Sequence, residues 1–192
     1  TEPWFGHHTV VLLQEWAKVF TVEFKLDIGD VSLRVDRLPV SRLGHYRTGH
    51  NGFGLKGEIA LNTGYLSRLS KWEVLGVLLH ELLHAWQDAH GTPGTSNHHN
   101  WEFRHKALSL GLIVDARGVT GFSDTSAFKD LLRHRGVEVP EGEIPPRQRA
   151  KGMSKLKKWT CSCGVNVRCA RPDFYAQCLE CGQVFKLAEA VQ

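Results

Sequence analysis

The side chains best suited to chemistry in this 192-residue chain lie between His80 and Phe103, where five histidines and two glutamates occur in 24 positions. This stretch begins with the sequence His-Glu-x-x-His. Residues four apart on an α-helix project from the same face, so His80 and His84 can bind one metal ion together. Glu81 would lie beside that metal, where its carboxylate can take a proton from a water molecule. The pattern predicts a zinc site with Glu81 as the general base.

A zinc ion that catalyses hydrolysis usually has three protein ligands and keeps one position for water. Four residues further along the chain are candidates for the third ligand: His90, His98, His99 and Glu102. His90 has the spacing found where such a helix breaks sharply, but that break needs a glycine where this chain has Gln87. Glu102 would instead complete a site of two histidines and one carboxylate.

His99 is favoured over His98 by its place in a helical pattern. A stripe at helical spacing, on the side expected to be buried, consists of His99, Phe103, Ala107 and Leu110. The helix that carries this stripe is predicted from about residue 97 to residue 112. His98 would project about 100° away from the stripe. The residues alone therefore favour His99 and leave the other three as alternatives.

Patterned segments around the motif predict the elements that position it. Apolar residues at helical spacing predict helices at 10–20 and 126–135, and a capping box of Ser70 and Glu73 begins the motif helix. Gly91 and Pro93 end that helix, because Gly suits the C′ position and Pro cannot continue a helix. Strands are predicted at 31–38, 44–46 and 58–62. We expect an α+β fold, with a small, mostly antiparallel sheet packed on helices.

All five cysteines lie in the last 32 residues, which favours metal binding over a secreted disulfide framework. Each cysteine pair is followed by glycine, the residue that most easily adopts the tight turn of a zinc knuckle. We expect one structural zinc held by four thiolates in a C-terminal β zinc ribbon, which would depend on the metal for stability. The ligands would be Cys161, Cys163, Cys178 and Cys181. Cys169 is left over; it could replace one of the four, or the segment could bind no metal.

The positive charge belongs to the C-terminal part of the chain. Residues 1–140 contain 15 basic and 15 acidic residues, whereas residues 141–192 contain 9 and 5, so the formal charge of +4 lies there. Basic residues neutralise phosphates and aromatic residues stack on bases, which suits nucleic acid, although a solvated linker is the usual role of such a run. The nucleic-acid contacts expected here are Arg147, Arg149, Lys151, Lys155, Lys157, Lys158 and Trp159.

Composition predicts an ordinary globular protein. The chain is 42% hydrophobic and 23% charged, and no apolar run approaches the roughly 20 residues that span a bilayer. Its start lacks the pattern of a secretory signal. We therefore expect a cytoplasmic protein without a membrane partner. The predicted domains are a core at 1–138, a linker at 139–158 and the ribbon at 159–192.

These segments together resemble the SprT-like/Spartan metalloproteases. Members of that family carry a His-Glu-x-x-His helix and then His-Gly-x-x-(Phe/Trp) on the next helix. Residues 99–103, HNWEF, match except that Asn100 replaces the glycine. The segment GEIALN before EVLGVLLHELLHAW and the zinc ribbon at the end are also similar, so the resemblance spans roughly residues 10–185.

The resemblance implies a zincin-like core with His99 as the third ligand. It implies a DNA-dependent zinc metalloendopeptidase that degrades DNA-bound or DNA-crosslinked protein in DNA–protein crosslink repair, associated with DNA or the nucleoid. Binding to DNA would be sequence-independent. It also implies that strand 58–62 is an edge strand above the site and pairs with an extended protein substrate. Nothing in the spacing chooses an oxyanion-stabilising residue among His45, Tyr46, Arg47 and His105.

Two other functions fit the residues. The chain could be a zinc peptidase without a DNA role, in which the C-terminal part recognises protein. It could also be a non-enzymatic nucleic-acid-binding protein whose histidine site is structural.

Overall fold

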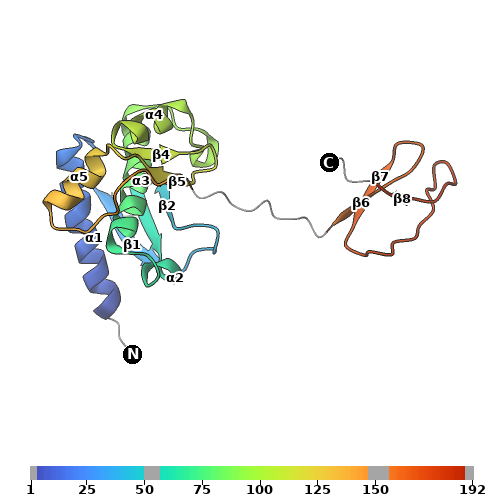
Figure 1. The fold of residues 1–192 in the computed structure, drawn as a ribbon, viewed down its shortest axis with the longest axis horizontal. Coiled ribbons are helices and arrows are strands. Elements are labelled where there is room, and N and C mark those ends of the chain that lie inside the picture. Colours follow the sequence, from blue (N-terminus) through green and yellow to red (C-terminus); the bar gives the residue numbers. More distant parts are fainter. Residues whose placement is uncertain (1–3, 50–56, 147–155, 189–192) are drawn as a thin grey trace. The chain divides into compact units, whose positions relative to one another are not determined.

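Figure 1 shows the computed structural model, which describes residues 4–49, 57–146 and 156–188. The chain divides into two compact units, Thr1–Arg147 and Gln148–Gln192. The helices of the first unit are α1 (Trp4–Glu23), α2 (Thr63–Leu66), α3 (Lys71–His90), α4 (Trp101–Ser109) and α5 (Ala127–His134), with a 3-10 turn η1 at Thr95–Asn97. Its strands are β1 (Val31–Asp36), β2 (Gly44–Thr48), β3 (Gly57–Asn62), β4 (Leu112–Val114) and β5 (Thr120–Phe122).

The three-stranded sheet of the first unit has the order β1-β3-β2. β1 pairs with β3 in parallel, and β2 pairs with β3 antiparallel. All pairings in the other two sheets are antiparallel, so the predicted α+β class with mostly antiparallel sheets is confirmed. The expectation that strand 58–62 is an edge strand is wrong. β3 is central because β1 pairs along its other side, and β2 is the edge strand beside α3.

Helix α3 forms the middle of the first unit because apolar side chains surround it. Its leucines are almost completely buried, and Trp16 and Phe20 of α1 belong to the same core. The capping box at its start is confirmed, with Ser70 N–H donating to Glu73 Oε2 at 2.9 Å. The helix ends at His90 as predicted, but Gly91 has an extended backbone, with φ of −129°, instead of the left-handed form.

The region after α3 differs most from the sequence-based expectation. The predicted helix at 97–112 is shorter, since α4 spans only Trp101–Ser109 with Asn100 as its N-cap. It is followed by an antiparallel hairpin of β4 and β5, which we did not predict. Strands of three residues between two helices leave too short a pattern to recognise.

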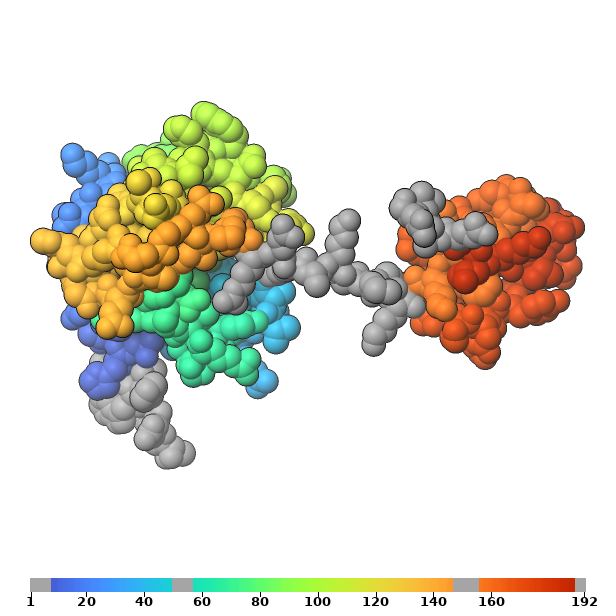
Figure 2. All heavy atoms as spheres, in the orientation of Figure 1, coloured from blue at the N-terminus to red at the C-terminus, as the bar shows by residue number. Residues whose placement is uncertain are grey.

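The C-terminal boundary of the first unit also differs from the prediction. The segment after α5 belongs to this unit, because Ile144 pairs with Phe122 of β5 and Lys129 donates to the Gly142 carbonyl. Figure 2 shows this segment, in orange, on the surface of the first unit. The predicted linker at 139–158 therefore begins too early. It also extends too far, since Lys157 and Lys158 lie in a strand.

The second unit is a small three-stranded sheet with two cysteine turns. Its strands are β6 (Lys157–Thr160), β7 (Asn166–Cys169) and β8 (Lys186–Leu187), in the order β7-β6-β8. Within residues 156–188 the buried core is small and consists of Trp159, Cys161, Cys178 and Phe185. Among the described residues of the chain, no helix is both long and apolar enough to cross a membrane.

Candidate metal centre

His80, His84 and His99 meet at one point in the first unit. One ring nitrogen from each lies within 4.8 Å of the others. The Nε2 atom of His99 is 2.9 Å from Nε2 of His80 and 3.1 Å from Nε2 of His84. Three imidazole nitrogens around one point form the donor set that zinc prefers at hydrolytic sites. The candidate metal site is therefore shown for all three predicted histidines, and their side chains fit a zinc ion.

The three imidazoles are held in the neutral form that a metal requires. Burial, and secondarily the neighbouring histidines, lower the pKa of His80 well below its usual value. Burial also lowers the pKa of His84 to about 3 and that of His99 to about 4. At neutral pH each ring keeps a nitrogen lone pair, so no proton has to be displaced before a metal binds.

Thr120 orients the first of these ligands. Its Oγ1 is 3.0 Å from Nδ1 of His80, so a proton on Nδ1 can be donated to the hydroxyl and Nε2 is left free for a metal. Gly118, in the same hairpin, lies so close to His99 that a Cβ there would be 2.3 Å from the ring. The β4–β5 hairpin thus forms one wall of the site. Sequence patterns could not identify Thr120, since it is 40 residues from His80.

Glu81 is buried beside the three histidines, with 6% of its surface exposed. Burial raises the pKa of Glu81 to about 8, while a hydrogen bond from Tyr46 N–H and the charge of Arg42 oppose the increase. Without a metal the carboxyl is therefore mostly protonated at neutral pH. The positive charge of a bound metal would favour the ionised form, which is the form that the predicted general base needs.

Strand β2 approaches Glu81 closely. A Cβ on Gly44 would lie 3.0 Å from Glu81 Oε1 and 2.9 Å from Leu61, so only glycine fits there without a shift. Tyr46 supplies the N–H that Glu81 accepts, and its phenol donates to Asp88 Oδ2 at 3.0 Å. These two hydrogen bonds hold the edge strand β2 against α3 beside Glu81.

His99 reaches the site from a different local structure than predicted. It lies two residues before α4, at the centre of a tight turn that Asn100 N–H closes by donating to the His98 carbonyl at 2.8 Å, and is not on the first turn of the helix. The rest of the predicted stripe is buried as expected, in Phe103, Ala107 and Leu110. The stripe indicated the correct residue because the chain enters α4 from the side that faces α3.

Two asparagines fix the segment that contains His99. Asn97 Nδ2 donates to the Tyr46 carbonyl at 2.7 Å, which ties the segment to β2. Asn100 caps α4 by accepting from Phe103 N–H at 3.1 Å. Asn100 Oδ1 also accepts from Gln87 Nε2 at 2.8 Å, which ties the segment to α3. The asparagine that departs from the family pattern therefore contributes to the placement of His99.

The other candidates for the third ligand are engaged elsewhere. Glu102 Oε2 accepts from Gln87 Nε2 at 2.7 Å and from Thr92 N–H at 2.8 Å, and these bonds lower its pKa. The ring of His90 is 2.7 Å from the Asp27 carbonyl. His98, like these two, is outside the group of converging donors.

The candidates for oxyanion stabilisation do not converge on the site. The Tyr46 phenol is bonded to Asp88, and burial raises its pKa. His45 and Arg47 alternate with Tyr46 along β2, so they project from the opposite face of the sheet. His105 stacks on the exposed Trp101, with ring centroids 5.1 Å apart. The charge of Arg42 acts on Glu81, and Arg42 was not predicted from the sequence.

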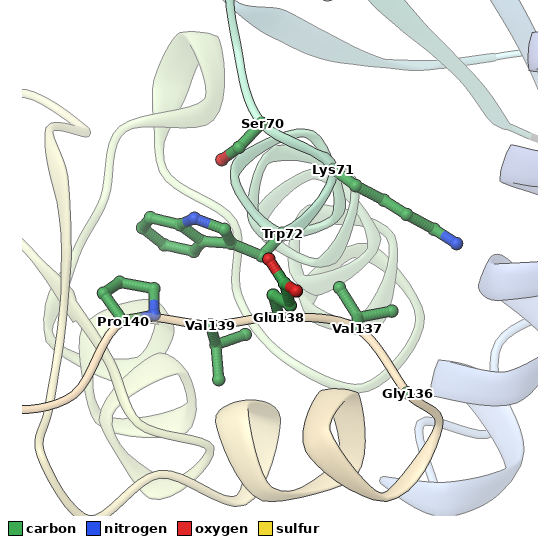
Figure 3. Close-up of a pocket in the computed structure, with 8 residues that line it drawn as sticks. All are labelled: Ser70, Lys71, Trp72, Gly136, Val137, Glu138, Val139 and Pro140. Atoms are coloured by element: carbon green, nitrogen blue, oxygen red, sulfur yellow. The ribbon is translucent and has the colours of Figure 1, made fainter.

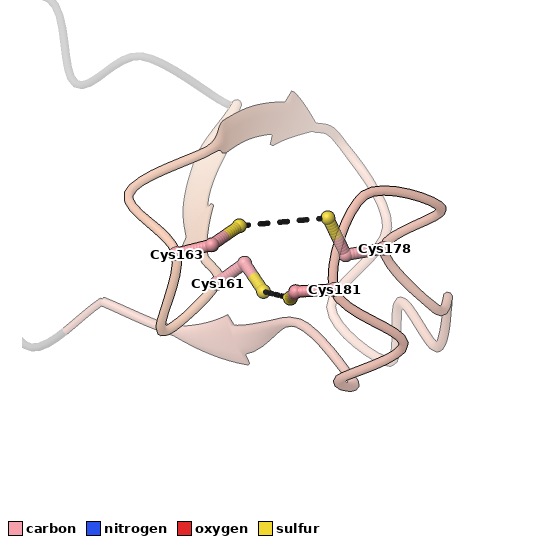
Figure 4. A group of neighbouring side chains, drawn as sticks. All are labelled: Cys161, Cys163, Cys178 and Cys181. Atoms are coloured by element: carbon pink, nitrogen blue, oxygen red, sulfur yellow. Dashed lines mark hydrogen bonds between the residues drawn. The ribbon is translucent and has the colours of Figure 1, made fainter.

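The four predicted cysteines form a second candidate metal site in the second unit (Figure 4). Their sulfur atoms lie within 4.8 Å of one another, and the closest pairs are 3.2 Å and 3.7 Å apart. These distances are too long for disulfides, which are about 2.05 Å. Gly164 and Gly182 have φ of +92° and +72°, as the knuckle turns require. Four thiolates around one point fit a structural zinc, and Cys169 is outside the group.

The predicted nucleic-acid contacts have different positions. Arg147, Arg149, Lys151 and Lys155 lie outside the described residues. Lys157 and Lys158 are exposed on β6, but Trp159 is buried and packs against Phe174 at 5.5 Å between ring centroids. The expectation that Trp159 stacks on a base is therefore wrong, because its ring belongs to the small core of this unit.

A cavity of about 560 Å³ in the first unit lies away from the histidines (Figure 3). It is formed by Ser70, Lys71 and Trp72 at the start of α3 and by the facing segment 136–140. His80 is nine residues further along the helix, about 13 Å of helical rise. The lining carries only one cation and one carboxylate, so we assign the chemistry to the metal centre and not to the cavity.

No family model, curated protein or solved structure matches this chain.

Proposed function

We propose that the protein is a zinc-dependent metalloendopeptidase that cleaves DNA-bound or DNA-crosslinked protein and is stimulated by DNA. The observation that carries the hydrolytic part is the convergence of three neutral histidines beside a buried carboxyl with a pKa of about 8. A structural zinc site needs no general base and is usually closed by four protein ligands. Three ligands with a carboxyl beside them favour a hydrolytic site instead.

His80, His84 and His99 would hold the zinc ion, which would acidify a bound water and polarise the substrate carbonyl. Glu81 would take the proton from the attacking water and pass it to the departing amine. Burial raises its pKa to about 8 in the metal-free protein, and the positive charge of the zinc ion would oppose that shift and favour the ionised carboxylate that accepts the proton. The Tyr46 N–H fixes the carboxylate on the side of β2.

The edge strand β2 is the surface on which we propose that an extended substrate pairs. Leu43 O accepts from Asn62 N–H at 2.8 Å, and alternation then directs the backbone groups of Gly44, Tyr46 and Thr48 away from β3. Glu81 and Asn97 already bond the groups of Tyr46, so among the described residues of β2 we propose Gly44 and Thr48 as the positions that pair with a peptide. Backbone pairing reads little sequence, which suits an enzyme with varied protein substrates.

The DNA part of the proposal is supported by the resemblance to SprT-like/Spartan proteases and by the basic C-terminal part of the chain. A protease that acts on proteins attached to DNA gains substrate selectivity by binding the DNA beside them. A zinc peptidase without a DNA role is the second candidate function, favoured by the neutral charge balance of residues 1–140.

The test is digestion of a DNA-binding protein by the zinc-loaded full chain, with and without single-stranded DNA at low salt. The expected result is cleavage that DNA accelerates and that Glu81→Gln abolishes while zinc content stays the same. Cleavage by Glu81→Gln at the wild-type rate would contradict the hydrolytic mechanism. Equal cleavage with and without DNA would support the peptidase without a DNA role.

A further inference from the structure

The strands of the second unit have an uneven distribution of charge. They contain four cations and no acidic residue: Lys157 and Lys158 in β6, Arg168 in β7 and Lys186 in β8. The two acidic residues of the described part of this unit, Asp173 and Glu180, lie outside the strands. Asp173 is paired with Arg171 at 3.6 Å. The charge on the strands is therefore not neutralised within the sheet.

The strand register places three of these cations on one face. Lys158 is directly opposite Arg168, and Lys186 is directly opposite Thr160, which has the same orientation as Lys158. Trp159 points to the other face, where it is buried. Lys157 shares the orientation of Trp159. We call the face formed by Lys158, Arg168 and Lys186 the basic sheet face.

The cations on this face are close together. Cys161 N–H donates to the Val165 carbonyl at 2.9 Å, and alternation makes Lys158 and Arg168 a non-hydrogen-bonded pair, in which side chains are closest. Their Cβ atoms are about 4.5–5.5 Å apart in such a pair. Ala188 N–H donates to the Lys158 carbonyl at 2.9 Å, so Lys186 is a diagonal neighbour of Lys158, about 7–8 Å away.

Like charges directly opposite each other destabilise a sheet, so this arrangement weakens a unit that already has a very small core. A polyanion that lies across the face would remove the repulsion. The three cations are exposed, as is Asn166 on the same face, while Thr160 is half-buried. No strand residue on this face is aromatic, so the face offers contacts to phosphates and none that stack on bases.

We propose that the basic sheet face binds the phosphate backbone of DNA, independently of sequence. This assigns DNA contact to Arg168 and Lys186 together with Lys158, and removes it from Lys157 and Trp159, which face the other way. The inference rests on the DNA-binding part of the proposed function and not on peptide hydrolysis. Its test therefore uses Glu81→Gln as the background, so that failure of the proposed enzymatic activity and failure of the face remain distinguishable.

The experiment measures binding of a short DNA duplex to the zinc-loaded full chain as a function of salt concentration. Each phosphate that a cation neutralises contributes about 0.9 to the slope of log K against log salt. The triple variant Lys158→Gln, Arg168→Gln, Lys186→Gln should reduce that slope by about 2.7. The charge-matched triple variant Arg37→Gln, Lys157→Gln, Arg171→Gln should change it by less than about 1.

The single variants Lys157→Gln and Lys158→Gln provide the closest comparison, because these neighbours carry the same charge on opposite faces. Lys158→Gln should weaken binding several-fold at low salt, and Lys157→Gln should leave it almost unchanged. Zinc content and circular dichroism establish that each variant is folded. An equal loss in both triple variants would show only general charge attraction and would overturn the proposal. The proposal would also be overturned if the triple variant of the basic sheet face bound DNA as tightly as Glu81→Gln alone. It would be overturned as well if that variant lost binding to phosphatidylglycerol vesicles but kept binding to DNA.

Discussion

A histidine can bind a metal only when one ring nitrogen is unprotonated, and burial provides that condition at this site. The pKa values of His84 and His99 are lowered to about 3 and about 4, and that of His80 is lower than usual for the same reason. The opposite applies to Glu81, whose pKa burial raises to about 8. In the metal-free protein, one desolvated environment thus produces neutral ligands and a protonated carboxyl, and the charge of a bound metal would shift that carboxyl toward its ionised form.

The choice of His99 over its neighbour can be tested directly. His99→Ala should lower the zinc content by one ion per chain. Loss of a residue that only supports a metal ligand weakens metal binding by about 10–100-fold, and loss of the ligand His99 itself should weaken zinc binding at the histidine site by more than that. His98→Ala is the matched control and should keep both ions. The measurements are metal analysis after gel filtration and competition with a chelator. Loss of zinc in His98→Ala, with full retention in His99→Ala, would contradict the assignment.

The raised pKa of Glu81 predicts how the stability of the metal-free protein depends on pH. The folded state favours the protonated carboxyl, so this contribution is fully present below pH 4.5 and is lost as pH rises to about 8. Glu81→Gln should therefore stabilise the metal-free protein at pH 9, on the order of a few kcal/mol, and the gain should shrink toward pH 4.5. Thermal unfolding at several pH values measures it. A gain independent of pH would contradict the assigned burial of the charge.

The histidines produce the opposite dependence in the same metal-free protein. Their folded-state pKa values are lowered, so their contribution is present above pH 6.5 and is lost as pH falls toward 4 and 3. The histidine variants keep Glu81, so measuring their unfolding over the same pH range separates the contribution of the histidines to stability from that of Glu81. Metal-free His84→Gln should lose less stability than the wild type between pH 6.5 and 4.

At the scale of elements, the site depends on how three segments are held around α3. The β4–β5 hairpin supplies Thr120, the edge strand β2 supplies the Tyr46 N–H, and the segment before α4 supplies His99. Gln87 joins the last of these to the helix, with 1% of its surface exposed and its amide donating to Asn100 and Glu102. Gln87 occupies the position where helices that break sharply have glycine, and here its side chain binds the segment before α4 to α3.

Gln87→Met tests that anchor, because methionine keeps the size of the side chain and removes its donors. Asn100 and Glu102 would lose this donor, although Asn100 would keep the Phe103 N–H and Glu102 the Thr92 N–H. Zinc affinity should fall roughly 10–100-fold, and the absorption spectrum of the cobalt-substituted protein should change, since His99 would lose its fixed position. Gln14→Met, on the exposed side of α1, is the matched control. An unchanged cobalt spectrum in Gln87→Met would show that Gln87 does not position the ligand.

The parts of the site that could be predicted from the sequence are those encoded locally. The face shared by His80 and His84, the capping box at Ser70 and the turn glycines after Cys163 and Cys181 each depend on residues a few positions apart. The place of β3 in the sheet depends on β1 pairing along its far side, which no local pattern contains. Thr120 was missed for the same reason. His99 was predicted as the third histidine of the group and does lie in it, although its segment is a turn and not part of the helix.

At the scale of the whole molecule, the two units should differ in their dependence on metal. The first unit has a core of more than twenty buried apolar residues around α3, whereas the second has Trp159, Cys161, Cys178 and Phe185. A core of that size is too small to offset the loss of conformational entropy on folding, so we expect a metal bound at the thiolate site to supply the difference. We expect a metal at the histidine site to add only local order to the first unit.

Removal of both metals with a chelator should therefore unfold the second unit and leave the first one folded. Amide hydrogen exchange is the measurement: peptides from β6 to β8 should lose their protection, and peptides from α3 should keep most of theirs. Cys163→Ser should reproduce this loss without a chelator and lower the zinc content by one ion, while Cys169→Ser should change neither. Protection of β6 to β8 that survives complete metal removal would mean that the small core of the second unit suffices. The thiolate cluster would then have to be explained by something other than stability.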